Sequence, residues 1–185
     1  MGGEVVIPPT VVIINAVSQA VETTYALDCQ ALAGTTSASI TGIALGRSQH
    51  ILVSACGAAP TPSFPIIMNA RTGEVDSVIT QVGGGDEVWY NPGADHFYVT
   101  GLDNTGTTGV QSLGVIDART NAWLQNLTDI RGKNPSALPE NNHIFTVVQI
   151  TQAIVEDPST DDSTCAQFGF RGRGCIALFA PENDD

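Results

Sequence analysis

The segment GGGDEVWYNPGADHFYVTG (residues 83–101) combines three glycines, two adjacent acids, an Asn-Pro-Gly turn and a run of alternating residues. The alternation over 87–90 and 96–100 predicts two short β-strands joined by a tight turn. The chain then continues into two further strand-like runs, 113–117 and 122–128. This part of the sequence therefore predicts four consecutive antiparallel strands.

The turn that follows the third of these strands occurs three times in the chain. The segments VVIINAVSQAVETTYAL (11–27), PIIMNARTGEVDSVITQV (65–82) and LGVIDARTNAWLQNLTDI (113–130) each place an Asn or Asp between an apolar strand and an alternating one. Asn15, Asn69 and Asp117 hold this position, 54 and 48 residues apart. Their short side chains can accept hydrogen bonds from the backbone two residues on and so start a turn.

A second repeated feature is independent of the first. All three histidines open similar segments, SQHILVSA (48–55), ADHFYVTG (94–101) and NNHIFTVV (141–148). His50, His96 and His143 are 46 and 47 residues apart. The chain therefore contains a true repeat with about four strands in each period, which is typical of a β-propeller blade.

The repeat predicts an all-β fold, a single partial β-propeller over residues 1–185. Residues 11–27 form part of a blade, 38–82 and 83–130 form complete blades, 131–180 form an incomplete blade, and 181–185 form an acidic tail. Helices should be nearly absent, because no segment shows a 3.6-residue apolar period. The total is roughly three and a quarter blades of four antiparallel strands, an incomplete ring, whereas propellers have typically four to eight blades.

The central unit resembles the YVTN-type repeat of lactonase-like and related surface propellers. Tyr98, Val99 and Thr100 match that motif, and Gly101 stands where the family has Asn. The segment GCIALFAP (174–181) also resembles the closing strand of such proteins. The resemblance covers nearly the whole chain, with the chain placed as the C-terminal half, and it implies fold more strongly than chemistry.

An arc of this kind exposes strand edges at both ends, and such edges pair readily with another chain. Three explanations stay open. The chain can be half of a propeller of about seven blades. Two or more copies can complete a ring together, or open edges can drive a larger ring or filament.

Composition excludes some classes of partner. The 19 acids and 7 bases give a net charge of −12, and Lys133 is the one lysine. Nucleic acids and anionic membranes both require a basic surface, so neither is an expected partner. No apolar run approaches the roughly 20 residues that span a bilayer, so no membrane insertion is expected.

The four cysteines point to an oxidising location. Pairing of sequence neighbours, Cys29 with Cys56 and Cys165 with Cys175, is favoured, because the second pair brackets the short loop CAQFGFRGRGC. Four buried thiols are the alternative. With the sequon at Asn126, this composition predicts an extracellular, periplasmic or cell-surface protein.

Asp86 and Glu87 are the strongest candidates for a functional site. They open the innermost strand of their blade, and their repeat counterparts are Ile40 with Thr41 and Lys133 with Asn134. Thr41, Asp86, Glu87, Lys133 and Asn134 are therefore predicted to line one mouth of the central channel. There the two carboxylates could hold calcium, or one could act as a base. The alternative is a solvated polar rim whose glycines provide the turn geometry.

Other candidates have simpler explanations. The shared repeat position of the histidines predicts partly exposed strand openings rather than a three-histidine metal site. The acidic segments 101–109 and 155–164 lack EF-hand spacing and are predicted to be surface loops. Trp89 is predicted to pack between blades, and Trp123 to face a partner or form a cross-strand pair.

These observations favour a non-catalytic extracytoplasmic binding or structural module that is completed by another propeller half or by a copy of itself. No cofactor is predicted, although calcium is possible. One alternative is a lactonase-like hydrolase with its site at the channel mouth, as the resemblance implies. The other is a self-assembling ring or filament subunit.

Overall fold

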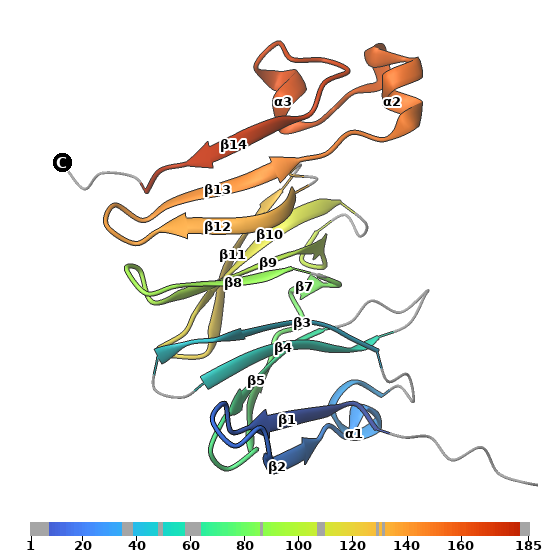
Figure 1. Ribbon diagram of the computed structural model, residues 1–185. Helices are drawn as coiled ribbons and strands as arrows, with labels where there is room; N and C mark the ends of the chain where they lie inside the picture. The colour runs from blue at the N-terminus through green and yellow to red at the C-terminus, as the bar shows by residue number, and fades with distance from the viewer. Residues whose placement is uncertain are drawn as a thin grey trace, which may run out of the picture.

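The computed structural model describes residues 8–34, 39–47, 50–57, 64–85, 87–106, 110–128, 130 and 132–181. Antiparallel sheets follow one another from the N-terminal end of the described chain to the C-terminal end (Figure 1). This confirms the predicted class, an incomplete all-β propeller. No helix in the described part of the chain is long and apolar enough to cross a membrane.

The first two sheets cover the N-terminal half of the arc. The N-terminal hairpin consists of β1 (Thr10–Ile14) and β2 (Val21–Ala26). Blade 1 is a four-stranded sheet in the order β3-β4-β5-β6. Its strands are β3 (Ser39–Leu45), β4 (His50–Gly57), β5 (Phe64–Asn69) and β6 (Val75–Val78). The short helix α1 (Cys29–Ala33) connects the hairpin to blade 1.

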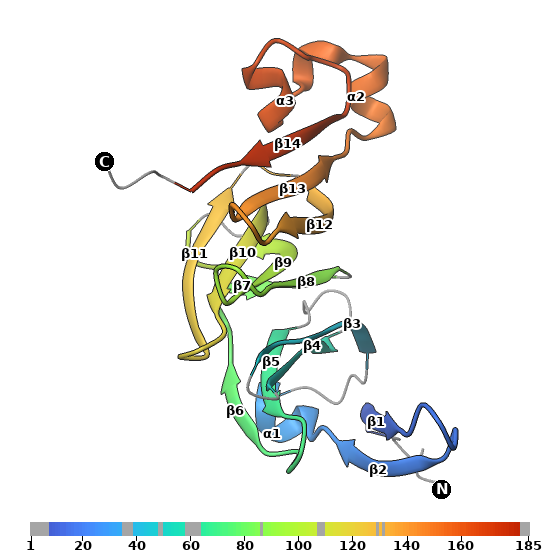
Figure 2. The same ribbon diagram turned by 60° about the vertical axis from the view of Figure 1, so that its left-hand side comes forward.

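The next two sheets complete the arc. Blade 2 contains β8 (Val88–Asn91), β9 (His96–Asp103), β10 (Gln111–Asp117) and β11 (Ala122–Thr128), and the two-residue strand β7 (Val82–Gly83) also pairs with β9. Blade 3 has the order β12-β13-β14, with β12 (Gly132–Leu138), β13 (His143–Val148) and β14 (Cys175–Phe179). Figure 2 shows the inner strands β3, β8 and β12 on one side of the stack and the outer strands β6 and β11 on the other.

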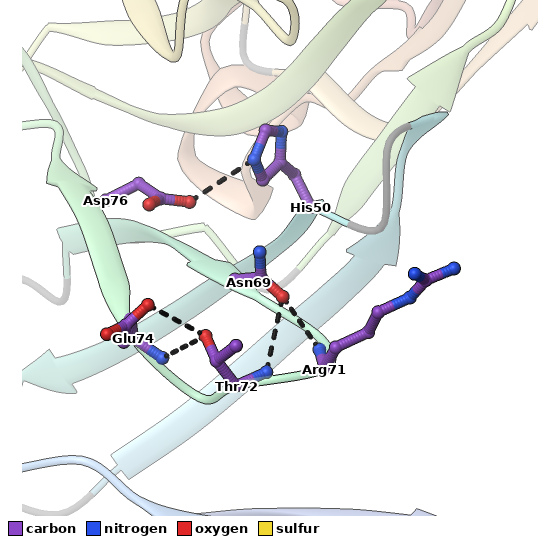
Figure 3. Close-up of polar contacts among 6 residues, drawn as sticks. All are labelled: His50, Asn69, Arg71, Thr72, Glu74 and Asp76. Atoms are coloured by element: carbon purple, nitrogen blue, oxygen red, sulfur yellow. Dashed lines mark hydrogen bonds and ion pairs between the residues drawn. The ribbon is translucent and has the colours of Figure 1, made fainter.

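The repeated Asn or Asp builds the same turn in all three places. Asn69 Oδ1 accepts hydrogen bonds from the backbone N–H groups of Arg71 (2.8 Å) and Thr72 (3.3 Å), as Figure 3 shows. Asn15 and Asp117 accept the equivalent pairs of bonds. Four residues after each of them the backbone is left-handed, at Gln19, Gly73 and Asn121. The turn chemistry predicted from sequence therefore joins the third and fourth strands.

Three apolar clusters hold the sheets together, one at each junction. Val11 and Leu27 of the hairpin region pack with Val53 and Met68 of blade 1. Blades 1 and 2 meet through the cluster of Leu52, Ile67, Ile79, Val82, Phe97, Val99, Ile116 and Ala118. Blades 2 and 3 meet through the cluster of Tyr98, Leu113, Val115, Ile130, Val148 and Cys165. Blades 1 and 2 are therefore packed on both faces through apolar side chains, as blades within a propeller are.

Both cysteine pairs form disulfides between sequence neighbours, Cys29–Cys56 and Cys165–Cys175. The first ties α1 to the end of β4. The second closes the loop before β14. The favoured pairing is therefore confirmed, and two disulfides are typical of a protein from an oxidising environment.

The expectation that helices are nearly absent is wrong between β13 and β14. This insertion contains α2 (Gln152–Glu156), the 3-10 helix η2 (Pro158–Thr160) and α3 (Thr164–Gln167). Each begins at a side chain that caps it, Thr151, Asp157 and Ser163 respectively. Helices of one turn are too short to show a 3.6-residue apolar period, and their capping residues also occur in loops.

Candidate functional site

Three of the predicted site residues lie in one groove on the side of the arc where the inner strands lie (Figure 2). The groove has a volume of about 570 Å³ and runs along the inner strands β3, β8 and β12. Thr41, Glu87 and Asn134 line it, together with the exposed ring of Trp89. Lys133 lies beside it in a smaller pocket of about 200 Å³. Asp86 lies outside the described residues.

The glycine-rich segment before β8 links blade 2 to blade 1. The Thr41 hydroxyl donates a hydrogen bond to the Gly85 carbonyl (2.7 Å), and the Ser54 hydroxyl donates one to the Gly84 carbonyl (3.0 Å). Gly85 has a φ of 106°, and a Cβ there would lie 2.5 Å from the Thr100 carbonyl oxygen. Glycine is therefore required where this backbone passes close to β9 and also turns its carbonyl groups toward blade 1.

Both carboxylate oxygens of Glu87 have partners. The Thr100 hydroxyl donates to Oε2 (3.1 Å), and Lys133 Nζ lies 3.8 Å from Oε1. Glu87 thus connects β9 of its own blade to β12 of the next one. A carboxylate with these contacts stabilises the junction of two blades, although a partly exposed ion pair contributes little energy, about 0–1 kcal/mol.

Asn134 sits at an irregularity of β12. The register with β13 shifts between Lys133 and Ser136, and Asn134 has a φ of 49°. Asparagine tolerates this left-handed conformation better than most residues. The shift brings the Asn134 segment into the groove beside Glu87.

The structure overturns the expectation for Trp89 and supports one of the two alternatives for Trp123. Trp89, predicted to pack between blades, is 43% exposed and lines the groove. Its neighbour Tyr90 points to the opposite face of β8 and packs on Phe97, with ring centroids 5.2 Å apart. Trp123 is half-buried against the cluster between blades 1 and 2 and pairs across the strands with Ile116. The cross-strand alternative for Trp123 is therefore the one that the structure supports.

The histidines occupy strand openings, as the repeat predicts. His50, His96 and His143 are the first residues of β4, β9 and β13, and all three are half-buried. His50 Nε2 lies 3.3 Å from Asp76 Oδ2 (Figure 3). Burial lowers the pKa of His96. Within the described residues, no three His, Cys, Asp or Glu side chains are grouped closely enough to hold a metal ion.

The acidic segment 155–164 is partly helical rather than a loop. Asp161 is buried and holds the insertion together. Its Oδ1 accepts from the Ser163 N–H (3.0 Å) and its Oδ2 from the Gly172 N–H (2.9 Å). Its carbonyl accepts from Arg171 Nη1 (2.7 Å). This aspartate therefore has a structural role. In segment 101–109, residues 107–109 lie outside the described residues.

The sequon asparagine is engaged in a network on the outer side of blade 2. Asn126 Nδ2 donates to the Gln81 carbonyl (2.8 Å) and to Asp103 Oδ1 (2.6 Å), and its Oδ1 accepts from Trp123 Nε1 (3.0 Å). Hydrogen bonds from Thr105, with a smaller effect from Asn126, lower the pKa of the Asp103 carboxyl. A glycan on Nδ2 would remove one of its two donated bonds. Glycosylation at this position stays a prediction.

Sequence reasoning missed the exposed aromatic residues of the disulfide-closed loop. Phe168 and Phe170 are both largely exposed, and Arg171 and Arg173 follow them in a chain with few bases. The insertion lies at the same end of the arc as β14 (Figures 1 and 2). Two phenylalanines within a short glycine-rich loop could have indicated this surface.

No protein-family model and no curated protein sequence matches the chain. Among solved structures, a eukaryotic initiation factor shares 16% identity over 63% of this chain and 27% of its own, with a TM-score of 0.46. Hydrazine synthase from Kuenenia stuttgartiensis shares 11% identity over 92% of this chain and 60% of its own, with a TM-score of 0.39. The chain thus spans less than two thirds of either protein.

Proposed function

We propose that this protein is a non-catalytic binding or structural module, an open propeller arc whose two end faces are covered by a copy of itself or by another propeller half. The observation that carries the proposal is a comparison of repeat positions. Ile14, Met68 and Ile116 each precede the turn-forming Asn or Asp. Met68 and Ile116 are 0% exposed, whereas Ile14 is 58% exposed.

The other end of the arc shows the same contrast. One repeat position lies opposite the second residue after the repeated histidine of each sheet. It is held by Ile67 in blade 1, Val115 in blade 2 and Leu178 in blade 3. Their exposed fractions are 0%, 4% and 50%. Ile14 with Val12 and Val21 forms the N-terminal face of the hairpin, and Leu178 with Val147 and Ile176 forms the C-terminal face of blade 3. Both apolar faces occupy positions that a neighbouring blade covers elsewhere in the chain.

The geometry of the groove is consistent with a structural role. Its Glu87 carboxylate binds Thr100 and Lys133, and the glycine segment beside it joins two blades. A hydrolase at the channel mouth would depend on Asp86 and on blades outside this chain. The two disulfides and the acidic surface support an extracellular, periplasmic or cell-surface location.

We expect the purified chain to associate through its end faces as its concentration rises. Ile14→Asp and Leu178→Asp should each weaken this association at least about tenfold, because each places a charge on an apolar surface that is covered on contact. Sedimentation velocity over a concentration series measures the effect.

Leu124→Asp is the matched control, since Leu124 is similarly exposed on the outer strand β11 but lies on neither end face. It should associate as the wild type does. A chain that stays monomeric at every concentration would contradict the proposal. Association that is unchanged by both Ile14→Asp and Leu178→Asp would also contradict the proposal.

A further inference from the structure

The N-terminal hairpin provides only two of the four strand positions of a blade. Its turn is equivalent to the turns that join β5 to β6 and β10 to β11, so β1 and β2 hold the third and fourth positions. Among the described residues, β1 pairs with β2 alone. The first and second positions of this blade, on the channel side of β1, are not filled by the hairpin.

The free edge of β1 can accept a strand. The Leu27 N–H donates to the Pro9 carbonyl (2.8 Å), so residues 9 and 27 form a hydrogen-bonded pair. Because such pairs alternate along an antiparallel ladder, the backbone N–H and C=O of Thr10 and Val12 point away from β2. A strand added beside β1 would therefore meet an alternating row of donors and acceptors.

Residues of β3 border the gap that these two unfilled strand positions leave. Ile43 and Leu45 lie directly opposite Val53 and Ile51, on the face of blade 1 that turns toward the hairpin. They are 56% and 58% exposed. Their counterparts one blade later, Val88 opposite Val99 and Tyr90 opposite Phe97, are half-buried against blade 1. In blade 2 these counterparts are covered by the two inner strands of the preceding blade, β3 and β4.

We propose that this gap binds a β-hairpin of a different polypeptide, with one strand paired to β1 and the other laid over Ile43 and Leu45. The inference rests on the proposed function and specifies its partner at the N-terminal end. Among the described residues of a second copy of this chain, no such hairpin is free. Its inner pairs β3–β4, β8–β9 and β12–β13 already continue into their own third strands β5, β10 and β14.

The chemistry of the gap specifies the hairpin. Its face toward blade 1 is apolar, to cover the two aliphatic side chains of β3. The hairpin strand that lies beside β1 carries free backbone groups in register with Thr10–Ile14. A neutral or basic sequence is favoured, because the arc carries a net charge of −12.

The test uses the whole chain and a fluorescent peptide that copies the first and second strands of blade 2, residues 88–99, closed by an added cysteine at each end. The peptide carries Asp95→Asn, which makes it neutral. Fluorescence anisotropy should show saturable binding. Val12→Pro should weaken it roughly tenfold, because proline removes an outward N–H while leaving the ladder to β2 intact. Ile43→Asp, which does not touch β1, should weaken it to a similar extent.

Two controls separate the gap from the rest of the surface. Val17→Ser changes a residue that is 95% exposed in the turn of the same hairpin, and Leu124→Asp changes an outer strand. Both should bind like the wild type. Failure of the peptide to bind a chain that still self-associates would overturn the hairpin inference alone. Failure of both binding and association would overturn the proposed function too, and binding unaffected by both Val12→Pro and Ile43→Asp would overturn the location.

Discussion

Replacing Phe97 with alanine is expected to lower the free energy of unfolding by about 3–5 kcal/mol. Phe97 is fully buried in the cluster that joins blades 1 and 2. Its Cζ lies 2.6 Å from where a Cβ on Gly46 would stand, so the ring rests directly on the backbone of blade 1. Neither that backbone nor the paired strand can move in to fill the space, and a cavity remains between the blades.

Urea denaturation with both disulfides intact measures this loss. Phe97→Leu should cost less than Phe97→Ala, because it keeps most of the apolar volume. Leu124→Ala is the control, and its exposed position predicts a change within about 0.5 kcal/mol. A loss below about 1 kcal/mol for Phe97→Ala would show that the blades do not pack face to face in the register described.

The second large effect is expected from removing the disulfide between Cys29 and Cys56. The two cysteines are 27 residues apart, and closing a loop of that length in the unfolded chain corresponds to about 3–4 kcal/mol in the chain-entropy account. The bond also anchors the N-terminal hairpin, and a two-stranded hairpin is marginally stable alone. The double variant Cys29→Ala/Cys56→Ala should therefore lose stability and release the hairpin.

Denaturation together with limited proteolysis tests both parts of this expectation. New cleavage should appear in the hairpin before the blades unfold. The matched variant Cys165→Ala/Cys175→Ala opens a loop of only 10 residues and should cost roughly 1 kcal/mol less. The reverse order of stabilities, or a hairpin that resists cleavage in the first variant, would contradict this account.

The repeat made most of the fold predictable. Asn15, Asn69 and Asp117 form the same turn because one side-chain oxygen accepts two backbone bonds, a local effect that residue type reveals. The histidines begin strands at equivalent positions because their spacing follows the period of the repeat. The insertion before β14 was not predictable, because its one-turn helices depend on caps and on the buried Asp161 rather than on an apolar period.

The candidate site was predictable in position more than in role. Counting along the repeat brings Thr41, Glu87 and Asn134 to the same groove. The contacts of the glycine segment could not be foreseen, because backbone carbonyl groups accept the hydrogen bonds of Thr41 and Ser54 and leave no side-chain pattern. The exposure of Trp89 was missed because β8 is short, and alternation alone does not tell which of its two faces packs against blade 1. In the structure Tyr90 packs on Phe97, so its neighbour Trp89 lies on the opposite, exposed face.

The most direct test of the open-arc account is hydrogen–deuterium exchange of the whole chain, compared between dilute and associated states. The account predicts that association slows exchange in β1 (Thr10–Ile14) and β14 (Cys175–Phe179), whose edges and faces lie at the two ends of the arc. Exchange in β11 (Ala122–Thr128), the outer strand of a complete blade, should not change. Protection that appears in β11 while β1 and β14 stay unprotected would contradict the account.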